Sequence, residues 1–164
     1  ENWPDLSDAA LAARREDWLL PALHDKTSLK DVSAGELSDA LMALLPWELR
    51  GRLDREAPTH FEAPTGNRYA LDYEGAGAPA VHIRVQELYG LKEHPAIARG
   101  RLPLTLYLLS PSHRPIQITR DLPGFWSGSW AAVRSDMRGQ YPKHVWPDDP
   151  AHAAPTARAK PRGT

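Results

Sequence analysis

The amino-acid sequence predicts an α+β protein with N-terminal helices, a small twisted and mainly antiparallel sheet, and a C-terminal amphipathic helix. Three observations support this fold class. Leucines recur at helical spacing up to residue 56, apolar and polar residues alternate after it, and tryptophans recur at helical spacing beyond residue 122. We therefore divide the chain into a helical segment (residues 1–56), an α+β domain (57–150) and a flexible basic tail (151–164).

The helical segment contains recognisable start signals. Ser7 can accept a hydrogen bond from a first-turn N–H, so we expect it to cap a helix running through AALAARREDWLLPALH. Pro21 lies within this stretch, and we expect a kink or a break there. Ser33 and Glu36 have the spacing of a capping box, and Pro46 suits the first turn of a further helix, PWELRGRLDRE. We interpret this segment as a helical packing module.

The periodicity changes at Pro58, after which short strand patterns follow one another. One strand is predicted after the turn PTGN, and AVHIRV is predicted to be a second. PLTLYLL and RPIQITR flank the turn SPSH and are typical of a hairpin. The stretch between the second and third strands is long enough for a short helix and a crossing loop. Four short strands with short connections favour an antiparallel or mixed sheet.

The last predicted element is one helix, LPGFWSGSWAAVRSDMRG. Asp121 can cap its start, and Gly139 is suited to a left-handed stop. Trp126 and Trp130 are spaced to lie on one face, with Val133 and Met137, and we expect this face to pack on the sheet.

The segment YPKHVWPDDP, residues 141–150, follows this helix and contains three prolines that cannot continue it. We interpret the segment as a strap, in which Tyr141 and Trp146 are structural anchors that lie back across the fold. One of the two aspartates, Asp148 or Asp149, is expected to pair with a nearby arginine.

Several functional classes find no support in the sequence. The chain has no cysteine, which excludes disulfides, Cys-ligated zinc and thiol catalysis. It lacks the phosphate-loop, dinucleotide, HExxH and GxSxG motifs, and its seven histidines are scattered. No apolar run approaches the roughly 20 residues of a membrane helix. The start lacks Met and a signal-peptide core, which suggests a segment cut from a longer protein, with removal of the start by processing as the alternative. We expect no catalytic residue, no metal and no membrane partner, and a cytoplasmic location.

Charge is distributed unevenly along the chain. Residues 1–56 carry a net charge of −5, whereas residues 57–164 carry +4, which gives the second part a mild preference for polyanions. Basic side chains there lie close in sequence to aromatic ones, the combination that single-stranded RNA binding requires. The candidate nucleic-acid-binding residues are Arg120, Arg134, Arg138 and Lys143.

The aromatic residues beside them have a second explanation. Trp126 and Trp130 are already accounted for as the buried side of a helix, so we interpret them as structural. Arg134 and Arg138 then form an exposed i, i+4 row, partly offset by Asp136. Whether this row contacts RNA stays open at this point.

The run LLSPSHRPIQITRDLPGFWSGSWAAVRSDMRGQYPKHVWPDDP, residues 108–150, closely resembles the C-terminal region of the HrpB family of bacterial DEAH-type ATP-dependent RNA helicases. LDREAPTHFEAPTGNRYALDY and RVQELYGLKEHPAIARGRLPL are similar to the same region. The resemblance covers residues 40–164 strongly and the first part loosely. It implies that the intact protein hydrolyses ATP and acts on RNA. It also implies that ATP and Mg²⁺ bind in two RecA-like domains outside this chain, so no catalytic residue carries over.

The predicted function is a non-catalytic C-terminal accessory domain of an RNA helicase. Its expected partners are the motor domains of the same polypeptide, on which it would pack, and single-stranded RNA. The alternative is a protein-interaction or regulatory module that does not touch RNA, which would suit the acidic, leucine-rich first third. A free-standing small enzyme has no supporting constellation of residues.

Overall fold

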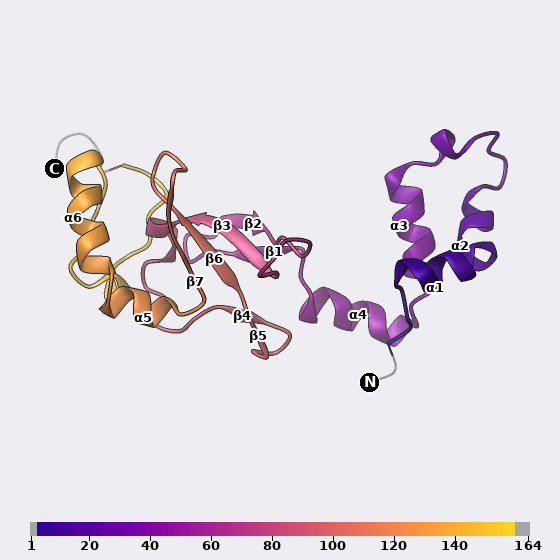
Figure 1. The fold of residues 1–164 in the computed structure, drawn as a ribbon, viewed down its shortest axis with the longest axis horizontal. Coiled ribbons are helices and arrows are strands. Elements are labelled where there is room, and N and C mark those ends of the chain that lie inside the picture. The colour runs from indigo at the N-terminus through magenta and orange to yellow at the C-terminus, as the bar shows by residue number, and fades with distance from the viewer. Residues whose placement is uncertain (1–2, 160–164) are drawn as a thin grey trace. The chain divides into compact units, whose positions relative to one another are not determined.

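The computed structural model describes residues 3–159. It divides into two compact units, the first ending at Arg55 and the second beginning at Glu56. The first unit is built from helices, and the second combines short strands with helices (Figure 1). The predicted α+β class is therefore confirmed. Residues 160–164 of the predicted tail lie outside the described part.

Local capping interactions define the helix starts of the first unit. Ser7 Oγ accepts a hydrogen bond from Ala10 N at 3.4 Å, as predicted. Ser33 and Glu36 form the predicted capping box, with Ser33 N donating to Glu36 Oε2 at 2.8 Å. The helices are α1 (Asp8–Ala13), α2 (Arg15–Ala22), the 3₁₀ turn η1 (Leu29–Asp31), α3 (Ala34–Ala43) and α4 (Trp47–Glu56).

The first predicted helix differs from the structure in two respects. It is broken at Arg14, between α1 and α2, and Pro21 lies inside the last turn of α2 without ending it. In the described part of this unit, which begins at residue 3, none of the four α-helices contains a fully buried side chain, and Leu45, between α3 and α4, is 4% exposed. The first unit therefore has only a small core of its own.

Within residues 56–159, the second unit contains three small sheets, where we predicted one. A central sheet has the order β3–β6–β7, and two hairpins, β1–β2 and β4–β5, accompany it. The strands are β1 (His60–Glu62), β2 (Arg68–Ala70), β3 (Ala80–Arg84), β4 (Ala96–Ile97), β5 (Leu102–Pro103), β6 (Thr105–Leu109) and β7 (Pro115–Thr119).

Most strand pairs are antiparallel, and the predicted β6–β7 hairpin is confirmed. β3 and β6, however, are parallel. The 3₁₀ turn η2 (Val85–Leu88) and the β4–β5 hairpin lie between them in the chain and supply the crossover that a parallel pair requires.

The last predicted helix is in fact two helices, α5 (Leu122–Ser127) and α6 (Trp130–Gln140). The break is at Gly128, where a Cβ atom would lie 2.9 Å from the Gly124 carbonyl oxygen. Asp121 caps α5 as predicted, accepting from Gly124 N at 2.9 Å. Gly139 does not end α6, because the helix continues to Gln140 and Tyr141 is its C-cap. Our placement of a left-handed stop at Gly139 was therefore wrong.

One hydrophobic core joins the central sheet to these helices. Val81, Ile83, Leu106 and Leu108 of the sheet are buried in the same cluster as the aromatic side chains of α5 and α6. After α6, the chain runs back along the same unit to the short 3₁₀ turn η3 (Pro150–His152) (Figure 1).

Part of the segment that we assigned to a flexible tail packs against the second unit. Ala151 and Ala153 contact the core, and Thr156 N donates to Gln86 O at 3.0 Å. The boundary at residue 151 was therefore placed too early. The prediction was based on the lack of large apolar residues in this segment. Backbone hydrogen bonds and contacts of small side chains hold it in place.

Candidate nucleic-acid interface

The strap, residues 141–150, is held in place by donors from the core. Trp130 Nε1 donates to Pro147 O at 3.0 Å, and Tyr89 Oη donates to Val145 O at 3.1 Å. Trp146 is 7% exposed, and its own Nε1 donates to Tyr141 O at 2.9 Å. These bonds satisfy the carbonyl groups of a proline-rich segment that forms no regular secondary structure before η3.

Between α6 and the strap lies a groove of about 340 Å³, which we call the basic groove. It is lined by two residues of α6 and three of the strap: Arg134, Arg138, Pro142, His144 and Trp146. The helical periodicity of α6 brings the two arginines to the same side of the helix, one turn apart. Cations in a concave site of this kind are suited to bind phosphate groups.

The two arginines of the groove have different environments. Arg134 donates from Nε to Trp146 O at 2.9 Å, and its Nη2 lies 2.7 Å from Asp148 Oδ1. Its side chain is only 22% exposed, so the exposed arginine row that we predicted is incomplete. Arg138 is exposed and forms no ion pair or hydrogen bond with any of residues 3–159. Arg134 therefore holds the strap in place, whereas the guanidinium group of Arg138 is exposed and carries the unpaired positive charge of the groove.

The other two predicted basic residues lie in different places. Lys143 lines a smaller cavity that shares Pro142 and His144 with the basic groove, so its charge is close by. Arg120 follows β7 and donates from Nη2 to Pro103 O at 3.3 Å. The structure thus groups three of the four predicted basic residues at α6 and the strap, and Arg120 is not one of them.

His144 is a groove residue that sequence reasoning did not select. Its Nδ1 lies 2.8 Å from Nε2 of Gln86, a side chain that is fully buried. Burial, followed by the positive charge of Arg84, holds the pKa of His144 below its usual range. The two partners are 58 positions apart in the sequence, so no local pattern could have indicated the pair.

The aromatic residues that we interpreted as structural lie mostly inside the fold. Trp126 is 8% exposed and Trp130 is 2% exposed, and their rings meet edge to face with centroids 5.4 Å apart. Tyr141 is half-buried and also packs against the core. The faces of both tryptophan rings are therefore not available for stacking on RNA bases.

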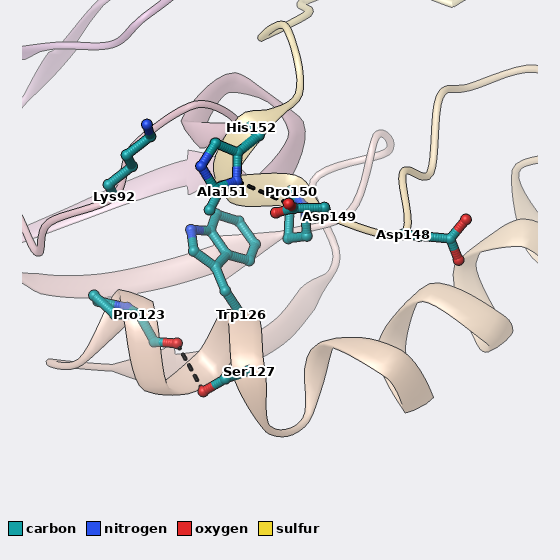
Figure 2. Close-up of a pocket in the computed structure, with 9 residues that line it drawn as sticks. All are labelled: Lys92, Pro123, Trp126, Ser127, Asp148, Asp149, Pro150, Ala151 and His152. Carbon is teal, nitrogen blue, oxygen red and sulfur yellow. Dashed lines mark hydrogen bonds and ion pairs between the residues drawn. The ribbon is translucent and has the colours of Figure 1, made fainter.

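A second cavity, of about 360 Å³, is lined mainly by residues of α5, the end of the strap and η3, and it has a different character. The ring of Trp126 lines it, and Asp149 and His152 pair across its rim at 2.8 Å (Figure 2). Asp148 is directed away from Trp126 in this view, consistent with its pairing to Arg134. The one lysine among its lining residues, Lys92, is outnumbered by the carboxylates of Asp148 and Asp149, so this cavity is less suited to a polyanion than the basic groove.

Glu87 belongs to a buried polar cluster. Its side chain is 0% exposed, and its carboxylate accepts hydrogen bonds from Thr65, Asn67, Tyr69 and Arg84. Burial alone would raise the pKa of Glu87, but these hydrogen bonds outweigh it and hold the pKa below its usual range. A carboxylate that is buried and fully engaged with donors stabilises the fold and is not exposed to substrate.

Among residues 3–159, no group of three His, Asp or Glu side chains is arranged as a metal ion would require. Over the same range, no helix combines the length and the apolar character needed to span a membrane.

Comparison with known proteins gives consistent matches. The family described as ATP-dependent helicase C-terminal (HrpB_C) matches residues 18–150. The chain is 48% identical over 159 residues to the ATP-dependent RNA helicase HrpB of Escherichia coli (strain K12), which covers 97% of this chain and 20% of that protein.

Two solved structures agree with the sequence match. The crystal structure of the E. coli DExH-box NTPase HrpB has a TM-score of 0.89 at 48% identity, over 97% of this chain and 20% of that one. The crystal structure of the Escherichia coli DEAH/RHA helicase HrpB has a TM-score of 0.71 at 45% identity, over 89% and 18%. The chain spans about a fifth of the length of these relatives.

Proposed function

The chain belongs to the HrpB_C family of ATP-dependent helicase C-terminal domains, and on this basis we propose that it is a non-catalytic accessory domain of an ATP-dependent RNA helicase. The family resemblance predicted from the sequence is confirmed by the match over residues 18–150. Because the chain lacks phosphate-binding loop motifs, ATP and Mg²⁺ would bind elsewhere in the longer polypeptide.

Packing on the motor domains of the same polypeptide is one part of the proposal. Large apolar side chains of the first unit are exposed, including Trp47 at 80%, Leu29 at 67% and Leu20 at 57%. A unit with so small a core gains stability when another surface covers such residues. The rest of a polypeptide about five times as long would supply that surface.

Contact with single-stranded RNA through the basic groove is the other part. The observation that carries it is the unpaired Arg138 beside Arg134 in a concave site, with Lys143 next to it. Side chains of this kind bind the phosphates of the backbone and do not read the bases. Because Trp126 and Trp130 are buried, the proposed contact rests on the cations alone and lacks the base stacking that the sequence had suggested.

Replacing Arg138 with Gln is expected to weaken binding of single-stranded RNA to the 164-residue chain and to lower the salt dependence. One lost phosphate contact should reduce the slope of log affinity against log salt by about 1. Titration of a fluorescent RNA at about 50 and 200 mM salt measures this. Arg68→Gln, an exposed arginine on β2, is the matched control and should leave the slope unchanged. Absence of binding by the wild-type chain at low salt would refute the RNA contact.

The alternative function, a protein-interaction module that does not touch RNA, is favoured by the exposed Trp47 and by the acidic first unit. Under this alternative, Trp47→Ala in the full-length helicase should reduce the coupling of ATP hydrolysis to RNA, with RNA affinity unchanged. ATPase rates measured with and without RNA test it. Arg138→Gln in the same protein would then have no effect on RNA binding, which separates the two functions.

A further inference from the structure

The contact between Gln86 and His144 connects the buried core to the basic groove. Gln86 is fully buried, and it uses Nε2 to bind His144 Nδ1 at 2.8 Å. Its second polar atom, Oε1, is buried and has no hydrogen-bond partner within the described residues. Buried polar atoms are satisfied in the great majority of cases, so an unsatisfied amide oxygen beside a titratable ring calls for an explanation.

The amide can hold the histidine ring in either charge state. When the ring is neutral, Nδ1 accepts a hydrogen bond from Nε2 of Gln86. When the ring is protonated, Nδ1 carries a hydrogen and must donate, and a half-turn of the amide brings Oε1 into the position of acceptor. One hydrogen bond joins the two side chains in both states, so His144 can gain a proton without losing its partner.

The charges around the ring are mainly positive. Burial lowers the pKa of the ring, and Arg84 of β3, which is itself paired with buried Glu87, lowers it further, while Arg134 and Arg138 line the same groove from α6. On the strap, Lys143 is adjacent, and the Tyr141 ring meets the imidazole edge to face with centroids 6.3 Å apart. Asp148, the acidic residue of the strap nearest the groove, is engaged by Arg134. A negatively charged ligand in the groove would offset these positive charges, raise the pKa of His144 and so favour the protonated ring.

We propose that the basic groove binds a phosphate group of the RNA backbone, with His144 as a proton-linked ligand beside Arg134 and Arg138 and with Gln86 as its positioning residue. This inference rests on the RNA contact proposed above and adds a pH dependence to it. The free groove holds a neutral histidine, and phosphate binding takes up one proton at the ring. RNA affinity therefore rises as the pH falls from 8 towards 6.

The test measures the affinity of the 164-residue chain for a short fluorescent single-stranded RNA at about pH 6 and about pH 8, at constant ionic strength. The wild-type chain is expected to bind about fivefold more tightly at the lower pH. His144→Gln keeps a neutral polar side chain and should remove this difference. His113→Asn is the control, because His113 is exposed on the β6–β7 turn at φ 64°, a conformation that Asn tolerates, and it should retain the difference.

A second measurement does not depend on the folding of a variant. The pKa of the His144 ring is followed by NMR in the wild-type chain, with and without inorganic phosphate, and is expected to rise when phosphate is present. In a separate arm that does use a variant, Gln86→Leu, which removes both amide atoms, should weaken the response of His144 to phosphate.

The outcomes separate this inference from the RNA contact itself. If Arg138→Gln weakens RNA binding but His144→Gln keeps the full pH dependence, the proton linkage is wrong and the RNA contact stands. A pKa of His144 that does not respond to phosphate also overturns the linkage. If the wild-type chain binds no RNA at low salt, or binds only acidic protein segments, both proposals fail.

Discussion

Replacing Glu87 with Ala is expected to lower the free energy of unfolding of the second unit by about 3–5 kcal/mol. The carboxylate accepts hydrogen bonds from Thr65 and Asn67 at 2.8 Å each, from Tyr69, and from Arg84 Nε at 3.0 Å. Its removal leaves these donors without their acceptor, and Arg84 without its counter-ion at a site that is 20% exposed. Urea denaturation monitored by tryptophan fluorescence measures the loss.

The control for Glu87→Ala is Glu74→Ala, which removes an exposed carboxylate of the same unit and should change the stability by no more than about 0.5 kcal/mol. Glu87→Gln adds a test of charge. Because the pKa of Glu87 is lower in the folded chain than its ordinary 4.5, its ionised form stabilises the fold above pH 4.5. This contribution is lost as the pH falls through the lower, folded-state pKa.

The stability difference between wild type and Glu87→Gln should therefore be largest near neutral pH and should shrink as the pH falls below 4.5. A difference that stays constant down to about pH 3 would show that the Gln side chain disturbs the packing and that the charge is not responsible. A Glu87→Ala variant as stable as Glu74→Ala would contradict the role of the cluster altogether.

Elements that depend on neighbouring residues were predictable from the sequence. The caps at Ser7, Ser33 and Asp121 join groups within three positions of one another, and the β6–β7 hairpin closes over a short turn. Interactions of this kind form between residues that are close in sequence, so a short stretch of sequence is enough to predict them. They explain why the fold class and most helix starts were predicted correctly.

Elements that depend on distant contacts were not predictable in the same way. The parallel pairing of β3 with β6 requires a crossover whose path cannot be read from strand patterns alone. Periodicity likewise predicted a single helix, whereas the structure has two helices separated at Gly128. The prediction missed this break because the helical spacing of the tryptophans continues across it. In both cases tertiary packing decided between alternatives that the local sequence left equal.

The candidate site shows the same limit. Arg134 and Arg138 have equivalent positions on a helical wheel, and composition alone treats them alike. The structure distinguishes them, because the strap turns back and places Trp146 O and Asp148 against Arg134. His144 contacts Gln86, a residue 58 positions away in the sequence. Which of the two cations braces the fold and which is left unpaired is therefore decided by the strap.

Replacing Trp146 with Ala is expected to lower the stability of the second unit by about 3–5 kcal/mol and to lower the melting temperature clearly. Trp146 is 7% exposed, its ring centroid lies 6.2 Å from that of Trp130, and its Nε1 bonds Tyr141 O. Truncation leaves a cavity beside Trp130 and an unpaired carbonyl. Trp47→Ala is the control, since an 80% exposed tryptophan should contribute no more than about 0.5 kcal/mol to the stability of the isolated chain.

Trp146→Phe then separates the ring from its hydrogen bond. It keeps most of the apolar contact and loses only the Nε1 donor, so a smaller loss of about 1 kcal/mol is expected. RNA affinity should fall with stability in this series, because Arg134 binds the carbonyl of Trp146 and moves when the strap loosens. If Trp146→Ala melts like the wild type but no longer binds RNA, the ring acts in the RNA contact directly, and the strap is held by its backbone alone.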